Sequence, residues 1–406
     1  MEVTKIKKCI IYLGDFDLRN QNVQAHLVKN NAKILNDLGY CVAFIGVNRE
    51  ARRDDIISLP KLDIGEGNYF LELENTLSMS GLFKYNIVKK QIILFMNKLA
   101  EEKDVECVIS YQSPTFSRIL KKIALWCREK GAKYIVNSAD IPILSAQPFI
   151  RRIVMTYNWN YLHRINKKYA NGIIAVSRYI QKFYHKDGIP SVIIPPLFDD
   201  YIDNDYELNE LTTFVYAGTP FIMKKGVSTV GMKDRLDLII DLCLKLLSEG
   251  QRFRLLVIGI TKEIYVSCIP RHREVVEKNM NILFMGRFSH QDTLNAVRNA
   301  DYMINIRDVN IMNEAGLSTK LVESVSLGTP VVMNSVGDSF LYLDDGITGY
   351  ELSQNYEKDI DLMRSLINKS REERMANKVK CAGNKTFSLD KYTTILKSFL
   401  NEVVSK

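Results

Sequence analysis

The chain has 406 residues, of which 46% are hydrophobic and 25% are charged, a composition typical of soluble globular proteins. This length predicts two domains, and the net charge of +8 suits anionic substrates or lipid headgroups, although no nucleic-acid-binding module is present. The number of cysteines, seven, is odd, and no two of them form a C-x-x-C pair. This argues against a disulfide framework or a zinc site and favours a reducing compartment.

The N-terminal segment predicts a strand, a helix and a second strand. Apolar runs over 9–14 and 39–46 flank helical periodicity over 23–38, and this order predicts parallel pairing of the two strands. The first strand follows the start of the chain directly, so we expect no signal peptide. The absence of an apolar run of about 18 residues predicts no membrane span. The loop after Gly14 lacks the Gly-x-Gly-x-x-Gly fingerprint, which disfavours a dinucleotide cofactor.

Residues 82–100 predict a helix with an apolar face and a lysine-rich face, whereas the preceding residues 50–82 are irregular. We favour a helix that packs on the core and exposes its lysines. The alternative is an interfacial helix on an anionic membrane, because cationic amphipathic helices bind such surfaces.

The rest of the first half continues the alternation of strands and helices. Strands are predicted over 105–111, 132–137, 172–177 and 191–196, and helices over 116–130, 150–170 and 178–185. Asp140 follows a strand, where we favour a turn or a helix cap, although site residues also gather at such ends. The acidic residues 197–211 predict a linker. Asp203 and Asp205 imitate an Asp-x-Asp metal motif, but their place in the linker argues against a metal site.

The second half begins a new series of strands at 214–218. A lysine-bearing loop follows, and Asp234 is expected to cap an amphipathic helix over 235–247. Further strands are predicted over 254–260, 282–286 and 301–307, and a final amphipathic helix over 387–404.

The most informative stretch runs from 313 to 333. It follows the strand at 301–307 and a polar loop. Ser318 or Thr319 is suited to cap a helix of about two to three turns, and Gly328 is suited to the left-handed position after its end. A new strand follows at once. The stretch therefore predicts a strand, a loop, a helix and a strand.

The start of this helix predicts an anion site. Free N–H groups and the helix dipole meet there, and Lys320 adds a full positive charge. One turn later, Glu323 offers a carboxylate to two vicinal hydroxyls. Taken singly, each residue is ordinary on a surface helix, but a phosphate site and a diol site together indicate a nucleotide sugar.

This stretch resembles the donor site of GT-B glycosyltransferases, most closely the retaining family 4. Glu323 and the ending Gly328-Thr329-Pro330-Val331-Val332 match the second Glu and the helix end of that family. Ala315 replaces the first Glu, with Glu314 one residue early. The stretch is instead similar to bacterial polysaccharide transferases with an Arg, then Asn-x-Ala-Gly, then Ser-Thr-Lys-x-x-Glu. The matching residues are Arg307, Asn313, Ala315, Gly316, Ser318, Thr319, Lys320 and Glu323.

The resemblance implies an α/β fold of the GT-B type, with two Rossmann-like parallel-sheet domains facing across a cleft. An acceptor domain would span 1–200 and a nucleotide-sugar donor domain 201–385. A terminal helix at 386–406 would cross back to the first domain. Backbone amides of 316–319 would take over the contacts of the missing Glu.

The resemblance also implies site residues. The catalytic set would be Lys233, Lys320, Arg307 and Glu323. Lys225 is the alternative to Lys233 as the family's lysine before the helix. Glu323 would hold the ribose. Thr219 stands where the family usually has Arg, so one cation is either missing or supplied by Arg307. Donor contacts are implied for Gly14, Asp15, Gly218, Gly286, Arg287, Asn313, Glu314, Ala315, Gly316, Leu317, Ser318 and Thr319, and an acceptor contact for Asp140.

The implied activity is transfer of a sugar from a nucleotide diphosphate sugar to a hydroxyl of a glycan or lipid-linked glycan. Retention of configuration, no metal or other cofactor, and a role in surface or exopolysaccharide biosynthesis follow from the resemblance. The expected place is the cytoplasm, with the inner face of the plasma membrane as an option. Ala315 and Thr219 differ from the residues that the family usually has at these positions. A second interpretation is therefore a catalytically inactive GT-B protein that binds a partner or a membrane. A sugar-nucleotide epimerase of the same architecture is a third interpretation.

Overall fold

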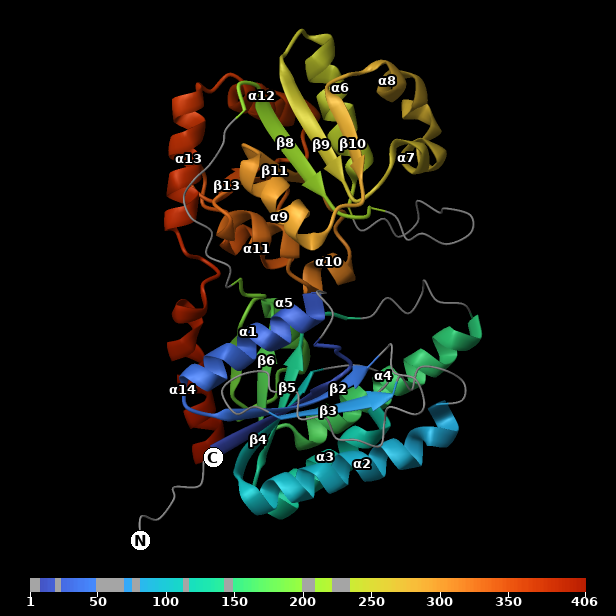
Figure 1. Cartoon of the computed structure of the whole chain (residues 1–406), viewed down its shortest axis with the longest axis vertical. Helices are drawn as coiled ribbons and strands as arrows, with labels where there is room; N and C mark the ends of the chain where they lie inside the picture. Colours follow the sequence, from blue (N-terminus) through green and yellow to red (C-terminus); the bar gives the residue numbers. More distant parts are fainter. Residues whose placement is uncertain are drawn as a thin grey trace. The chain divides into compact units, whose positions relative to one another are not determined.

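The computed structural model describes residues 8–18, 23–48, 69–74, 81–111, 117–141, 149–198, 209–220 and 234–406. They fall into two compact units, Met1–Leu197 with Leu389–Lys406, and Phe198–Ser388 (Figure 1). Lys225, Lys233 and the pair Asp203 and Asp205 lie outside the described residues. Each unit is built on one parallel β-sheet.

The first unit holds a seven-stranded sheet in the order β3-β2-β1-β4-β5-β6-β7. Its strands are β1 (Lys8–Gly14), β2 (Cys41–Asn48), β3 (Tyr69–Glu74), β4 (Asp104–Tyr111), β5 (Lys133–Ser138), β6 (Gly172–Ala175) and β7 (Ser191–Ile193). β1 pairs in parallel with β2, from Cys9 opposite Cys41 to Leu13 opposite Ile45, which confirms the predicted strand–helix–strand unit. The strand order reverses between β1 and β4, the kind of position at which open α/β sheets bind ligands.

The edge strand β3 was not predicted, because the residues around it show no clear periodicity. Its alternation of Leu71 and Leu73 with two glutamates is too short to separate a strand from a loop. In the structure β3 pairs in parallel with β2, with Ala43 opposite Tyr69. The extended conformation of β3 therefore depends on its pairing with β2 and not on its own sequence pattern.

Helices cover both faces of this sheet, with α2, α3 and α4 on one side and α1, α5 and α14 on the other (Figure 1). They are α1 (Val23–Asp37), α2 (Gly81–Glu102), α3 (Ser117–Lys130), α4 (Phe149–Tyr169), α5 (Arg178–Tyr184) and α14 (Leu389–Ser405). Ile92, Met96 and Leu99 of α2 are buried in the core, which confirms the favoured core-packed helix over 82–100.

The second unit holds a six-stranded sheet in the order β10-β9-β8-β11-β12-β13. Its strands are β8 (Thr212–Ala217), β9 (Phe253–Ile258), β10 (Ile282–Gly286), β11 (Tyr302–Asn305), β12 (Val331–Met333) and β13 (Gly349–Glu351). Its helices are α6 (Leu236–Ser248), α7 (Lys262–Cys268), η2 (Pro270–His272), α8 (Arg273–Lys278), α9 (His290–Asn299), α10 (Ile311–Ala315), α11 (Thr319–Ser326), η3 (Gly337–Leu341), α12 (Tyr356–Ile367) and α13 (Arg371–Gly383). Here the strand order reverses between β8 and β11.

Side chains of β8 alternate between two cores on the two faces of this sheet. Phe214 and Tyr216 belong to the core that α6 and α12 cover, whereas Val215 and Ala217 belong to the core that α9 and α11 cover. Because β8 and β11 pair in parallel, their carboxyl ends lie at one edge of the sheet, and Lys320 of α11 lies against Gly218 at this edge.

Candidate functional site

The helix α11 begins and ends where the sequence predicts. Ser318 is its N-cap residue, and Gly328 follows its last turn with a φ of +73°, in the left-handed region that glycine adopts easily. The Ser318 side chain does not make the expected capping hydrogen bond, and its Oγ instead accepts from Asn305 Nδ2 at 3.5 Å. The first-turn N–H groups of α11 thus remain suited to an external anion.

Lys320 lies against the end of β8 and is held there by a buried carboxylate. Its Nζ donates to Asp234 Oδ2 at 2.7 Å, and the Tyr216 hydroxyl donates to the same oxygen at 3.0 Å. A Cβ on Gly218 would lie 2.5 Å from Lys320 Cε and 2.8 Å from its Nζ, so glycine makes room for the lysine. The Lys320 side chain is still 15% exposed, so its ammonium keeps a path to solvent.

The prediction that Asp234 caps the helix after it is wrong. α6 begins at Leu236, with Arg235 as its N-cap residue and no side-chain capping bond. The Asp234 carboxylate instead faces Lys320 and Arg307, whose Nε lies 3.5 Å from Asp234 Oδ1. Burial raises the pKa of Asp234, but the two cations lower it more strongly, so the pKa lies below its ordinary value and the group is ionised at neutral pH.

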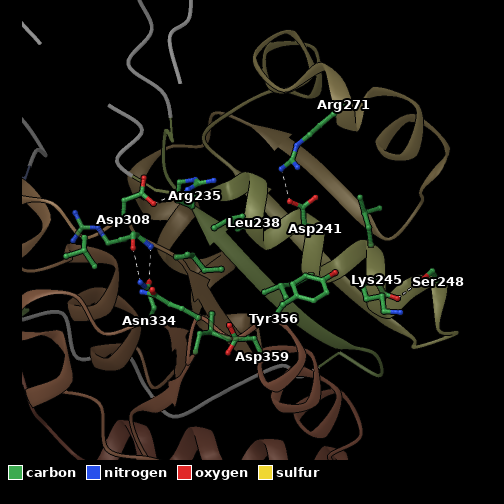
Figure 2. A pocket seen from close by; sticks show the side chains of 17 residues that line it. Arg235, Leu238, Asp241, Lys245, Ser248, Arg271, Asp308, Asn334, Tyr356 and Asp359 are labelled. Carbon is green, nitrogen blue, oxygen red and sulfur yellow. Dashed lines mark hydrogen bonds and ion pairs between the residues drawn. The ribbon is translucent and has the colours of Figure 1, made fainter. Parts of the chain in front are cut away.

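Two cations therefore share one carboxylate. Arg307 follows β11, its side chain is 5% exposed, and its Nε makes no hydrogen bond among the described residues. Two hydrogen bonds with the Asn334 amide fix its backbone, as Figure 2 shows. Burial lowers the pKa of Arg307, and Asp234 opposes this shift. The cluster of Lys320, Arg307 and Asp234 carries an excess positive charge in a largely buried place, which favours an incoming anion.

Glu323 lies one turn into α11 and is partly buried. Burial raises the pKa of its carboxyl to about 7, and Lys320 lowers it only in part. Among the described residues, no hydrogen bond or ion pair fixes this carboxylate. A carboxylate with a perturbed pKa beside a cationic cluster is a candidate for ligand binding.

Three glycines at the carboxyl ends of β8, β9 and β10 lie beside this cluster. The Gly259 N–H donates to Gly286 O at 2.7 Å, and a Cβ on Gly259 would lie 2.3 Å from Gly218 O. Lys320 fills the space at Gly218 and the Gly218 backbone fills the space at Gly259, whereas a Cβ on Gly286 would have Thr261 Cγ2, at 3.8 Å, as its nearest neighbour among the described residues. The backbone at Gly286 is therefore open to a ligand. Gly259 and Tyr216 were not predicted as site residues. Glycine at the ends of three strands, at Gly218, Gly259 and Gly286, is a pattern in the sequence that could have identified Gly259. Arg287, which follows β10, is exposed.

The residues before α11 form a short helix, α10, where the sequence predicts only a polar loop. The Asn310 side chain caps it by accepting from the Asn313 N–H at 3.0 Å. The Gly316 N–H donates to Met312 O at 3.1 Å. The Gly316 amide, one of those expected to face a donor, is therefore already used within α10.

The other candidates in this segment are held by the protein itself. The Asn313 side chain is buried and donates from Nδ2 to Asp308 O at 2.8 Å. Ala315 and Leu317 are buried, and Leu317 belongs to the core below α11. A Cβ on Gly337 would lie 2.6 Å from the carbonyl oxygen of Glu314, so the backbone there packs closely. These contacts fix the position of the α11 start.

Gly14, Asp15 and Asp140 belong to the first unit, whereas the Lys320 cluster belongs to the second. Gly14 ends β1, where a Cβ would lie 2.7 Å from Tyr111 Cβ, so the close contact with β4 accounts for this glycine. Asp140 follows β5 and is exposed. Of the candidates in the second unit, the structure brings Arg307, Lys320 and Gly218 together around Asp234.

A separate cavity of about 740 Å³ runs along α6 (Figure 2). Its lining includes Arg307 but neither Lys320 nor Glu323. Figure 2 shows Arg235 and Arg271 in its wall, and both are paired with carboxylates, Arg235 at 3.0 Å from Asp308 Oδ1. We place the candidate site at the Lys320 cluster, because its cations lie beside the start of α11, whereas Arg235 and Arg271 in the cavity wall each pair with two carboxylates.

The chain has the GT-B fold of solved glycosyltransferase structures. HepE from Anabaena in complex with UDP matches 97% of this chain and 99% of its own at 12% identity, with a TM-score of 0.64. A glycosyltransferase from Rickettsia africae matches 98% and 99% at 16% identity with the same TM-score of 0.64. Sucrose-phosphate synthase from Thermosynechococcus elongatus matches 98% and 100% at 11% identity, with a TM-score of 0.62.

No protein-family model matches the chain, and no curated protein matches it by sequence. The structural likeness confirms the predicted fold class, an α/β protein of the GT-B type with Rossmann-like parallel sheets. At such low identity a shared fold does not assign an activity, so the function rests on the site.

Proposed function

We propose that the protein is a glycosyltransferase that moves a sugar from a nucleotide diphosphate sugar to a hydroxyl of a glycan or lipid-linked glycan. The observation that carries this proposal is the cluster in which Lys320 and Arg307 share Asp234 beside the start of α11. Excess positive charge at a helix N-terminus fits a diphosphate. HepE, which has the same fold, has been crystallised with UDP and with UDP-glucose, and this supports a nucleotide sugar as the donor.

The cluster suits the charge that develops during transfer. When the bond between sugar and phosphate breaks, the nucleoside diphosphate leaves with additional negative charge, which preorganised cations and N–H groups stabilise. Lys320 Nζ, held 2.7 Å from Asp234 Oδ2, is in position before a donor arrives. Lys233 is proposed as a third cation, with Lys225 as the alternative. These cations supply the compensating charge, so we propose transfer without a metal or other cofactor.

Glu323 is assigned to the ribose hydroxyls. Hydroxyls that donate to a carboxylate stabilise its charged form, so donor binding would lower the pKa of Glu323 from its value of about 7. The nucleobase is assigned to the backbone at Gly286, with Arg287 next to it in the chain. Backbone N–H groups at the start of α11 complete the donor site.

We further propose that the sugar is transferred with retention of configuration. The acceptor oxygen forms a bond to the anomeric carbon, the bond to the diphosphate breaks, and a donor phosphate oxygen takes the acceptor proton. Asp140 of the first unit is proposed to contact the acceptor. The seven cysteines are free thiols, which supports the cytoplasm as the compartment and surface or exopolysaccharide biosynthesis as the setting.

Two variants test this proposal. Lys320→Ala and Glu323→Ala should each lower donor-dependent turnover about tenfold or more, because a lost charge-assisted contact is worth about 1.5–3 kcal/mol. Lys369→Ala is the matched control, since it removes a lysine that donates to Tyr350 Oη at 2.6 Å elsewhere in the same unit. Wild-type turnover in both site variants would remove these residues from the active site.

The alternatives are separated by binding and product measurements. Calorimetric titration with UDP and other nucleoside diphosphates that shows no binding at millimolar concentration would favour an inactive GT-B protein. Incubation with a nucleotide sugar alone that yields its isomer would favour an epimerase. The proposed transferase should bind a nucleoside diphosphate and leave the sugar of its donor unchanged until an acceptor is added.

A further inference from the structure

The N-terminal half of α4 presents a large apolar surface to solvent. Its exposed side chains are Phe149 at 67%, Ile150 at 78%, Ile153 at 55%, Val154 at 50% and Tyr157 at 61%. At 3.6 residues per turn, these positions fall within an arc of about 140° on one side of the helix. We call them the apolar stripe. A surface helix normally has polar side chains on its outer face, whereas the outer face of this half of α4 is apolar.

The apolar stripe is not needed to hold α4 on the first unit. Trp159 and Leu162, in the second half of the helix, pack into the core and lie on the side opposite the stripe, and Ile165 packs into the core next to the edge of the stripe. Figure 1 shows the other half of α4 extending away from the sheet. The C-terminal half therefore anchors the helix, and the N-terminal half carries exposed apolar area that the core does not use.

The charges on α4 are all positive. The helix contains no Asp or Glu, and its cations are Arg151, Arg152, Arg164, Lys167 and Lys168. Arg164, Lys167 and Lys168 are exposed and fall on the same arc as the apolar stripe, farther along the helix. Arg152 lies over the ring of Phe149, with its guanidinium carbon 5.6 Å from the ring centroid. One face of α4 thus passes from apolar to cationic side chains.

We propose that α4 is the docking surface for an anionic lipid bilayer, with the apolar stripe among the acyl chains and the basic residues at the lipid phosphates. Because the apolar and basic residues follow one another along the same arc, the N-terminal end of α4 would enter the bilayer while Arg164, Lys167 and Lys168 stay at the level of the lipid phosphates, where each basic residue is attracted to an anionic surface. Because α4 carries only positive charges, it is complementary in charge to anionic headgroups. No helix in the described part of the chain is long and apolar enough to cross a bilayer.

This assignment moves the membrane contact from α2, the alternative considered for 82–100, to α4. α2 buries Ile92, Met96 and Leu99 in the core and ends with Glu101 and Glu102. The inference deepens the proposed function, in which the acceptor is lipid-linked, because it names the surface that would bring the protein to such an acceptor. It is tested without donor or acceptor, so its failure is distinct from failure of the transferase assay.

The test is co-sedimentation with phosphatidylcholine vesicles, with and without about 30 mol% phosphatidylglycerol. The wild-type chain should bind the anionic vesicles and bind the neutral ones weakly. The double variant Ile150→Glu with Ile153→Glu should bind anionic vesicles at least tenfold more weakly, because it places charge within the apolar stripe. Leu94→Glu is the matched control, since Leu94 is 72% exposed on α2, and it should bind like wild type.

A second variant separates the electrostatic contribution. Replacing Arg164, Lys167 and Lys168 together by Gln should weaken binding to anionic vesicles about a hundredfold, because each basic residue near such a surface contributes about fivefold. Circular dichroism melting checks that the variants are folded. Absence of wild-type binding to anionic vesicles would overturn the inference, as would wild-type binding by the Ile150 and Ile153 double variant. Concentration-dependent dimerisation that this variant abolishes, without vesicle binding, would assign the stripe to a second copy of the chain instead.

Discussion

Asp234→Asn tests the central cluster, because it keeps the shape of the side chain and removes the charge that Lys320 and Arg307 share. Neutralising one partner of a buried ion pair costs about 3–5 kcal/mol, since the remaining charge stays buried. Lys320 is 15% exposed and recovers some hydration. We therefore expect a loss of about 3 kcal/mol in the free energy of unfolding. For a unit of this size, the loss corresponds to a fall in Tm of about 6–12 °C.

A bound diphosphate would return negative charge to the two cations. Saturating UDP should therefore raise the Tm of the Asp234→Asn variant more than it raises the wild-type Tm. Turnover should nevertheless fall at least tenfold, because nothing holds Lys320 Nζ in place in the absence of the carboxylate. Differential scanning fluorimetry with and without UDP, together with a donor-dependent assay, measures both effects.

Asp301→Asn is the matched control for this variant. Asp301 Oδ2 lies 2.8 Å from Arg374 Nη1, and both side chains are buried in the second unit. This variant should also lose stability, but its response to UDP should equal that of wild type. Equal UDP shifts in the Asp234→Asn and Asp301→Asn variants would refute the assignment of Asp234 to an anion site.

The remaining predictions concern Glu323 and Gly218. Burial raises the pKa of Glu323 to about 7, above the unfolded value of about 4.3, so its ionisation costs native stability as pH rises through this window. Urea unfolding should show Glu323→Gln about 1–3 kcal/mol more stable than wild type at pH 8 and equal to it near pH 4, and equal stability at both would contradict the raised pKa. Gly218→Ala should displace Lys320 and lower turnover at least tenfold, since its Cβ would lie 2.5 Å from Lys320 Cε. Gly250→Ala, at a φ of +81° with no atom within 4 Å of its Cβ, should leave turnover unchanged, and equal turnover in the two glycine variants would contradict the role of Gly218.

Local patterns were sufficient for most of the fold. The alternation of apolar runs and helical periodicity predicts β1, α1 and β2, and the predicted parallel pairing of β1 with β2 is observed. The helix over 319–326 also begins and ends near the predicted residues, and Gly328 adopts the left-handed conformation expected after its end. Such signals act over a few residues, so they are visible in a single sequence.

The contacts of the site could not be predicted in the same way. Asp234 and Lys320 are 86 residues apart in sequence, and their pairing depends on how two strands of one sheet place their ends. A local pattern favours Asp234 as a helix cap, whereas the tertiary contacts with Lys320 and Tyr216 override that preference. β3 escaped prediction for a related reason, since its place at the sheet edge comes from pairing with β2.

The most direct test of the central claim is a crystal structure of the protein with UDP. The diphosphate should lie within hydrogen-bond distance of Lys320 Nζ and of the first N–H groups of α11, and the ribose hydroxyls should contact Glu323. UDP bound only in the cavity along α6, or bound with its diphosphate away from Lys320 and Arg307, would contradict the account.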